Sequence, residues 1–252
     1  MRRITLLLTL AGSLLLLPVT LRADGAEPSF VPSATLVNTD GEEEELTNGS
    51  SYDAPLTLTF APGVTDAEGC TLFYEWRIVQ VEGGKETTLA VRNDSVTDYT
   101  FREGGDGLSY RVSLAVTWRT ADGTEGTWEQ DDNDVFRFSL KSSSLQVFNG
   151  FSPNGDGIND VYRVKAQSLL SFRMAIFNRW GQPIVSGTDA TLEKEYTDGY
   201  TYYICWDGTL NGRVVDDGVY FIAIEALGSD GIVYSKHRDI NVMTRVVENG
   251  DN

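Results

Sequence analysis

The segment from residue 154 to residue 160 holds the side chains with the clearest chemical potential. It places four oxygen-bearing side chains close together: Asn154, Asp156, Asn159 and Asp160. Hard cations such as calcium prefer oxygen ligands of this kind. The order of an EF-hand loop is not met, because Asn159 stands where that loop needs glycine and Lys165 stands where it needs glutamate.

The same segment also has a structural interpretation as a turn. Asn and Asp side chains bond to nearby backbone groups, and Pro153 fixes the backbone at the start of the segment. Such a turn would order the entry into a strand over residues 161–164. We therefore predict a turn and no cofactor, with calcium as the alternative ligand.

Two further motifs stand where predicted strands end. They supply our candidate recognition residues, which are Asn178, Arg179, Trp180, Gly181, Trp206, Asp207 and Gly208. Tryptophan and arginine dominate protein–protein hot spots, so a rigid Arg-Trp pair at a strand end favours partner recognition. In the alternative interpretation Trp180 fills the core, Arg179 stacks on an aromatic ring or pairs with an Asp, and the glycines supply bends. We expect Trp180 to be mainly structural and Arg179 to be partly exposed.

Enzymatic residue sets are missing from the sequence. It has one histidine, His237, and neither a Gly-x-Ser-x-Gly elbow nor a phosphate-binding glycine loop. An acidic chain always offers two carboxylates, so a glycosidase remains open in principle. We predict a protein that is not an enzyme.

The elements that must carry these motifs are strands. Alternating apolar residues, rich in aromatic and β-branched types, occupy residues 56–60, 73–79, 110–118 and 135–138 of the first half. The second half repeats the pattern at 172–177, 218–226, 232–234 and 238–243, with Asp-Gly and Asn-Gly turns between. The acidic residues 42–45 are expected to form a solvated loop, and no stretch has a helical period.

This spacing predicts an all-β fold of two tandem immunoglobulin-like β-sandwiches, the second with about seven strands. Trp76 would occupy the third strand of the first sandwich, and Tyr110 would open a later strand. We place the first domain at residues 24–144, with an acidic lead-in, and the second at residues 145–252.

The N-terminal residues indicate export, and the net charge limits the possible partners. Residues 1–23 combine a basic start, an apolar run and a small residue before Asp24, the layout of a cleavable secretory signal peptide. The chain has 20 basic and 37 acidic residues; removing three arginines with the peptide leaves 17 against 37, a net charge of −20. Such a field repels nucleic acid and anionic lipid, so we predict neither as a partner.

The chain has two cysteines, Cys70 and Cys205, one in each predicted domain. We expect two separate buried thiols, with an interdomain disulfide as the alternative.

Residues 147–160, followed by Ile176–Gly181 and Trp206–Gly208, resemble in order and spacing the gliding-motility-associated C-terminal domain. This is the type B sorting domain of cargo of the type IX secretion system, and the resemblance covers residues 145–245. Residues 98–101 and 107–112 also look like part of a PKD-type immunoglobulin-like domain, although the Trp-Asp-Phe-Gly-Asp-Gly signature of that family is absent.

The resemblance implies a surface or secreted protein. Its partners would be the type IX translocon and an outer-membrane barrel protein of the PorP/SprF type, and it would meet the membrane only through that partner. Two alternatives stay open: a stable accessory subunit of the secretion or gliding apparatus, or a carbohydrate-binding surface protein using Trp118 and Trp128. The departures from the family pattern are an insert at residues 187–200, Val215–Gly218 in place of a Pro-x-Gly turn, and the tail 246–252.

Overall fold

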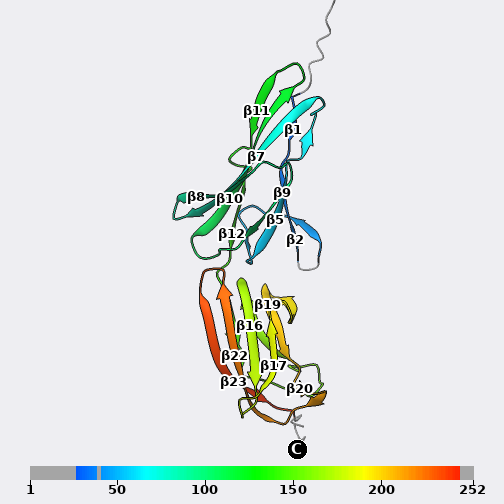
Figure 1. Cartoon of the computed structure of the whole chain (residues 1–252), viewed down its shortest axis with the longest axis vertical. Coiled ribbons are helices and arrows are strands. Elements are labelled where there is room, and N and C mark those ends of the chain that lie inside the picture. The colour runs from blue at the N-terminus through cyan, green and yellow to red at the C-terminus, as the bar shows by residue number, and fades with distance from the viewer. Residues whose placement is uncertain (1–26, 39–40, 245–252) are drawn as a thin grey trace, which may run out of the picture.

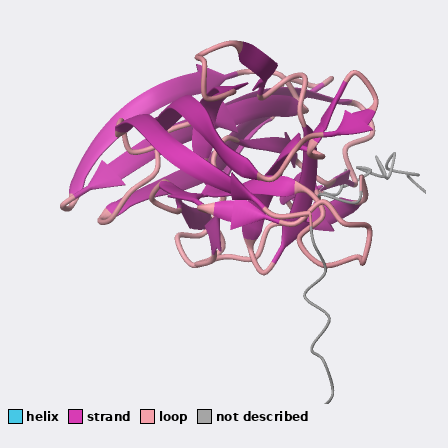
Figure 2. Ribbon diagram, turned by 90° about the horizontal axis from the view of Figure 1, so that it is seen from below, coloured by secondary structure: helices cyan, strands magenta, loops and turns pink. Residues whose placement is uncertain are grey.

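The structure, a computed structural model, describes residues 27–38 and 41–244. The expected signal peptide and the tail from Arg245 to Asn252 lie outside the described residues. Figure 2 shows only strands and loops in the described part of the chain. That part accordingly holds no helix long and apolar enough to cross a membrane.

The first domain is a sandwich of two main sheets. Its strands are β1 (Ser29–Phe30), β2 (Ser33–Val37), β3 (Glu43–Glu45), β4 (Ser51–Tyr52), β5 (Leu56–Ala61), β6 (Val64–Thr65), β7 (Cys70–Glu82), β8 (Lys85–Arg92), β9 (Thr97–Phe101), β10 (Leu108–Thr120), β11 (Glu125–Glu129) and β12 (Phe136–Leu140). One sheet has the order β4-β12-β10-β7-β8, with β11 also pairing β10. The other has the order β3-β2-β5-β9, and β1 pairs β6.

The second domain is also a two-sheet sandwich. Its strands are β13 (Ser144–Val147), β14 (Gly150–Phe151), β15 (Tyr162–Gln167), β16 (Leu169–Phe177), β17 (Pro183–Thr188), β18 (Glu193–Thr197), β19 (Tyr200–Trp206), β20 (Thr209–Leu210), β21 (Arg213–Val214), β22 (Gly218–Gly228) and β23 (Val233–Val242). The sheets have the orders β13-β15-β19-β18 and β14-β23-β22-β16-β17, and β20 pairs β21. The two sandwiches lie end to end along the long axis of the molecule (Figure 1).

Each sandwich has its own apolar core. The first core extends in sequence from Phe30 to Leu140 and the second from Val147 to Val242. Inward-facing side chains alternate with outward-facing ones along β5, β12 and β15, which is the pattern of a strand buried on one face. The all-β prediction of tandem immunoglobulin-like sandwiches is thereby confirmed.

Each sandwich contains a buried tyrosine whose hydroxyl donates to a backbone carbonyl of the same domain. The Tyr110 hydroxyl donates to the carbonyl of Glu103 at 2.6 Å, and the Tyr162 hydroxyl donates to the carbonyl of Phe148 at 2.6 Å. Burial raises the pKa of Tyr110 to about 12 and also raises the pKa of Tyr162, so both hydroxyls stay protonated donors. Trp76, expected in the third strand of such a domain, is fully buried and packs 5.6 Å from the ring of Phe60.

Three expectations about elements were wrong. The acidic run is not simply a loop, because Glu43–Glu45 forms the exposed edge strand β3, paired with β2. Residues 232–234 and 238–243 do not form separate strands, because β23 is continuous over Val233–Val242 and pairs with β22 throughout. The second domain has nine strands in its two sheets, more than seven, partly because the insert at 187–200 contains β18.

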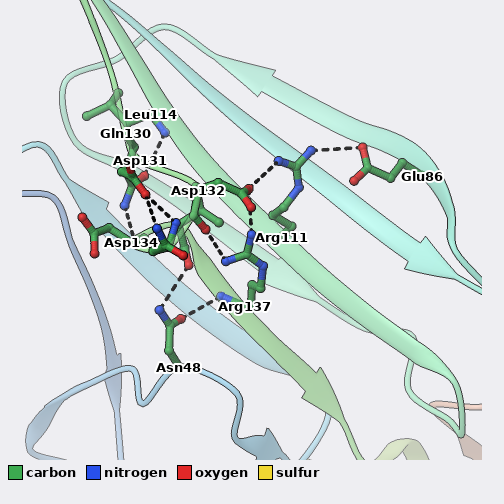
Figure 3. Close-up of polar contacts among 11 residues, drawn as sticks. Asn48, Glu86, Arg111, Leu114, Gln130, Asp131, Asp132, Asp134 and Arg137 are labelled. Carbon is green, nitrogen blue, oxygen red and sulfur yellow. Dashed lines mark hydrogen bonds and ion pairs between the residues drawn. The ribbon is translucent and has the colours of Figure 1, made fainter.

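Polar contacts attach the acidic loop between β11 and β12 to the first domain (Figure 3). Arg137 pairs with Asp132 at 2.8 Å, and Gln130 Nε2 donates to the Asp134 carbonyl at 2.8 Å. Asn48 accepts the Arg137 backbone N–H at 2.7 Å. The Asp132 carboxylate therefore joins this loop to β12.

Candidate functional site

The turn between β16 and β17 presents the Arg-Trp pair. The Asn178 side-chain oxygen accepts the backbone N–H groups of Trp180 and Gln182, each at 3.0 Å. The Gly181 N–H donates to the Asn178 carbonyl at 2.9 Å, and Gly181 adopts a φ of 75°, which glycine allows without strain. Arg179 and Trp180 thus stand at the centre of a tightly bonded turn, and their side chains leave the sheet.

Trp180 does not fill the core, which corrects the prediction that it is mainly structural. Its side chain is 76% exposed, although tryptophan is strongly buried on average. The Arg179 guanidinium lies 5.5 Å from the centroid of the Trp180 ring. This cation–π contact places the two side chains against each other while leaving both in solvent.

The turn between β16 and β17 lies at the end of the molecule farthest from the first domain (Figure 1). A groove of about 380 Å³ runs beside this turn. We call it the distal groove; its lining includes Arg179, Trp180, Ile184, Leu210, Val219 and Phe221, together with the acidic residues Asp216 and Asp217. Leu210, Val219 and Phe221 are 43%, 44% and 46% exposed. Exposed apolar residues grouped in this way mark interaction sites in soluble proteins.

Sequence reasoning missed Ile184, Leu210, Val219 and Phe221. The signal was present in the run Val219-Tyr220-Phe221-Ile222, which is apolar at every position and so cannot bury all its side chains in a strand with one core face. In the structure Ile222 is buried, and Val219 and Phe221 face solvent.

We predicted that the Trp206-Asp207-Gly208 motif takes part in partner recognition, but Trp206 and Gly208 are buried. Trp206 is 4% exposed, and its ring packs 5.4 Å from Phe151 and 5.1 Å from Tyr220. Asp207 accepts the backbone N–H of Thr209 at 2.9 Å. Gly208 has a φ of 76°, and a Cβ there would lie 2.6 Å from Pro153. Trp206 and Gly208 therefore shape the domain and do not present a recognition surface.

Residues 154–160 form the predicted turn. The Asp160 carboxylate accepts backbone N–H groups from Asn154, Gly155 and Gly157 at 3.1, 2.6 and 2.7 Å. The bonds from Gly155 and Gly157 contribute most to lowering the pKa of Asp160 below its usual value. Asn154 accepts the Asp156 N–H at 3.0 Å, and Asn159 has a φ of 55°. These side-chain oxygens accept hydrogen bonds from the backbone. Among the described residues, no group of three or more Asp, Glu, His or Cys side chains could hold a metal ion.

The structure also tests the predictions for the two cysteines and for two tryptophans of the first domain. Cys70 and Cys205 are separate free thiols, as predicted, but only Cys205 is buried in a core; Cys70 is half-buried and packs against the first core. Trp118 is 8% exposed, and the Trp128 ring packs 5.1 Å from Phe30. The two tryptophans considered for carbohydrate binding are therefore packed against the first core.

Comparison with protein families supports the interpretation of the second domain. Residues 145–237 match the family described as CHU_C type IX secretion signal domain, which confirms the resemblance noted in the sequence. The chain therefore carries a type IX secretion signal and is exported to the cell surface or secreted. No curated protein matches the chain.

Several solved structures are similar to the chain at low identity. Dimeric latent PorU from Porphyromonas gingivalis has 15% identity and a TM-score of 0.28, over 88% of this chain and 21% of that one. The tetra-tandem repeat of a large adhesion protein has 12% identity and a TM-score of 0.28, over 88% and 69%. Chicken CNTN1 FN1-FN3 has 12% identity and a TM-score of 0.28, over 82% and 73%. The chain thus spans about a fifth of the PorU chain.

Proposed function

We propose that the second domain docks on an outer-membrane component of the type IX system, a barrel protein of the PorP/SprF type, through the distal groove. The first domain is then the cargo, a binding or structural module that is not an enzyme. The observation that supports this proposal most strongly is the exposure of Trp180, 76%, at a groove of mixed polar and apolar lining in a domain that carries a secretion signal.

The groove has the composition of a protein-binding surface. An aromatic anchor, an arginine held against it, and flanking aliphatic side chains are the residue types that dominate binding energy at interfaces. The turn is already rigid, because Asn178 bonds to both Trp180 and Gln182, so little conformational entropy is lost when a partner binds.

Its location also favours docking. The β16–β17 turn and β20 lie at the opposite end of the molecule from the first domain (Figure 1). A partner can therefore hold the groove without contacting the cargo, so cargoes of different shape could use the same surface.

The test compares three full-length variants in the native host. Trp180→Ala and Arg179→Ala remove groove residues, and Tyr196→Ala removes a side chain that is 53% exposed on β18 of the same domain but outside the groove. Surface labelling of intact cells and periplasmic fractionation give the exported fraction. Co-purification from outer membranes identifies the bound partner.

We expect Trp180→Ala to weaken partner binding by about 2 kcal/mol or more and to accumulate in the periplasm, with Arg179→Ala intermediate and Tyr196→Ala unchanged. Wild-type surface levels and wild-type partner recovery for Trp180→Ala would refute the docking surface.

A further inference from the structure

The connection between the two domains is three residues long, and the backbones of Lys141 and Ser143 are hydrogen-bonded. β12 ends at Leu140 and β13 begins at Ser144. The Lys141 backbone N–H donates to the Tyr52 carbonyl at 2.8 Å, and the Lys141 carbonyl accepts the Ser229 hydroxyl at 3.2 Å. The chain therefore passes from one sheet to the other without a free linker.

The turn between β22 and β23 holds the connection from the side of the second domain. The Asp230 carboxylate accepts the Ser143 backbone N–H at 2.8 Å and the Ser143 hydroxyl at 2.6 Å. Burial alone would raise the pKa of Asp230, but these two bonds, together with backbone hydrogen bonds from Ile232 and Asp230, hold the pKa below its usual value. The Tyr234 hydroxyl lies 2.9 Å from the Ser143 hydroxyl and completes the cluster.

Other contacts join the domains directly. The Gly104 N–H donates to the Ser229 carbonyl at 3.1 Å, and the Ala54 N–H donates to the Ser168 hydroxyl at 3.2 Å. Ser168 and Ser229 are 4% and 3% exposed, so both bonds are shielded from water.

The backbones at the junction are also in close contact. A Cβ on Gly104 would lie 2.5 Å from the Lys141 carbonyl oxygen, and a Cβ on Gly228 would lie 2.0 Å from the Ser143 hydroxyl oxygen. Glycine is required at both places by proximity, since neither position has a positive φ.

We propose that this junction, defined as residues 141–143 with Asp230, Ser229 and Gly228, is a clasp that resists proteolysis, so that the exported protein keeps its secretion signal domain. Proteases cleave exposed, unbonded backbone, and a hydrogen-bonded segment must first open locally. Cleavage at the junction would require the loss of the Asp230 and Ser229 contacts together. The proposal needs only export of the chain and is independent of the distal groove.

The first test measures the intact mass of the wild-type protein recovered from the surface and the medium. The clasp predicts one species that includes residues 145–244. A chain ending between residues 140 and 148 would overturn the proposal.

The second test uses trypsin on the purified full chain, because Lys141 places a trypsin site inside the clasp. The readout is the rate at which the new N-terminus Ser142 forms, relative to cleavage after Lys165 within the paired strand β15. That internal reference separates opening of the clasp from unfolding of the domain.

Asp230→Ala removes the acceptor, and Gly228→Ala crowds Ser143 without removing any hydrogen-bonding group. We expect each variant to be cut after Lys141 at least about 10-fold faster than wild type, the effect of losing a hydrogen bond to a charged group. Asp239→Ala, on the exposed face of β23, is the control and should match wild type. Equal relative rates for wild type, Asp230→Ala and Gly228→Ala would refute the clasp.

Discussion

The guanidinium of Arg179 lies over the ring of its sequence neighbour Trp180, 5.5 Å from the ring centroid, in a turn that buries neither side chain. Adjacent residues on a strand point to opposite faces, so this contact exists only because the chain turns here. The turn is what converts a two-residue motif into a single surface feature.

Replacing each of the two tryptophans of the second domain by alanine should distinguish a surface side chain from a core side chain by the loss of stability. Trp180→Ala should change the free energy of unfolding by less than about 0.5 kcal/mol, because its side chain is mostly in solvent. Trp206→Ala should lower it by about 3 to 5 kcal/mol, because a buried ring is lost. Urea unfolding of the purified variants measures both, and similar effects for the two would contradict the assigned positions.

The Asp160 turn should make stability depend on pH in the acid range. A carboxyl whose folded pKa lies below its unfolded value, near 3.8, stabilises the fold above that value and loses this contribution as pH falls through the folded pKa. Wild type should therefore melt higher than Asp160→Asn at pH 7, and the difference should shrink below about pH 4. Melting curves across this range give the test; a difference independent of pH would rule out the carboxylate as the cause.

The thiol of Cys205 should be unreactive in the folded protein. Burial raises its pKa to about 12, so almost no thiolate is present at pH 8. Ellman's reagent should modify the half-buried Cys70 first and reach Cys205 only at the rate of unfolding. The variant Cys70→Ser isolates the Cys205 signal, and rapid modification of that variant in native buffer would contradict this position.

Removal of the tyrosine hydroxyls should destabilise both domains to a similar degree. Tyr110→Phe and Tyr162→Phe each leave a carbonyl without its donor, that of Glu103 or Phe148. We expect a loss of about 1 to 2 kcal/mol in the unfolding free energy of the affected domain. Tyr196→Phe is the matched control on an exposed tyrosine, and an equal loss there would show that the effect is not specific to these bonds.

Periodicity and turn chemistry supported the most accurate predictions from the sequence. The alternation in residues 56–60 and 110–118 identified two core strands, and the Asn and Asp residues of 154–160 identified their turn. Both patterns are local, so they can be read without knowing what packs against them.

The incorrect predictions concern places where residues distant in the sequence determine the local structure. Glu43–Glu45 forms a strand because β2 offers it a pairing partner, and nothing in an acidic run indicates this. Trp180 was expected in the core because large aromatics usually lie there, but a turn centre has no core face. The contact between Ser143 and Asp230 joins residues 87 positions apart, and no local pattern in either segment predicts it.

The position of β23 in its sheet has a consequence for synthesis and export. This strand is the last one in the described part of the chain, yet it lies inside the sheet, between β14 and β22. A chain that stops before residue 233 would leave both neighbours with open edges and would lack the buried residues Ile240 and Val242. We therefore expect a chain terminated before residue 233 to fail to fold its signal domain, and so to fail to be exported through that domain.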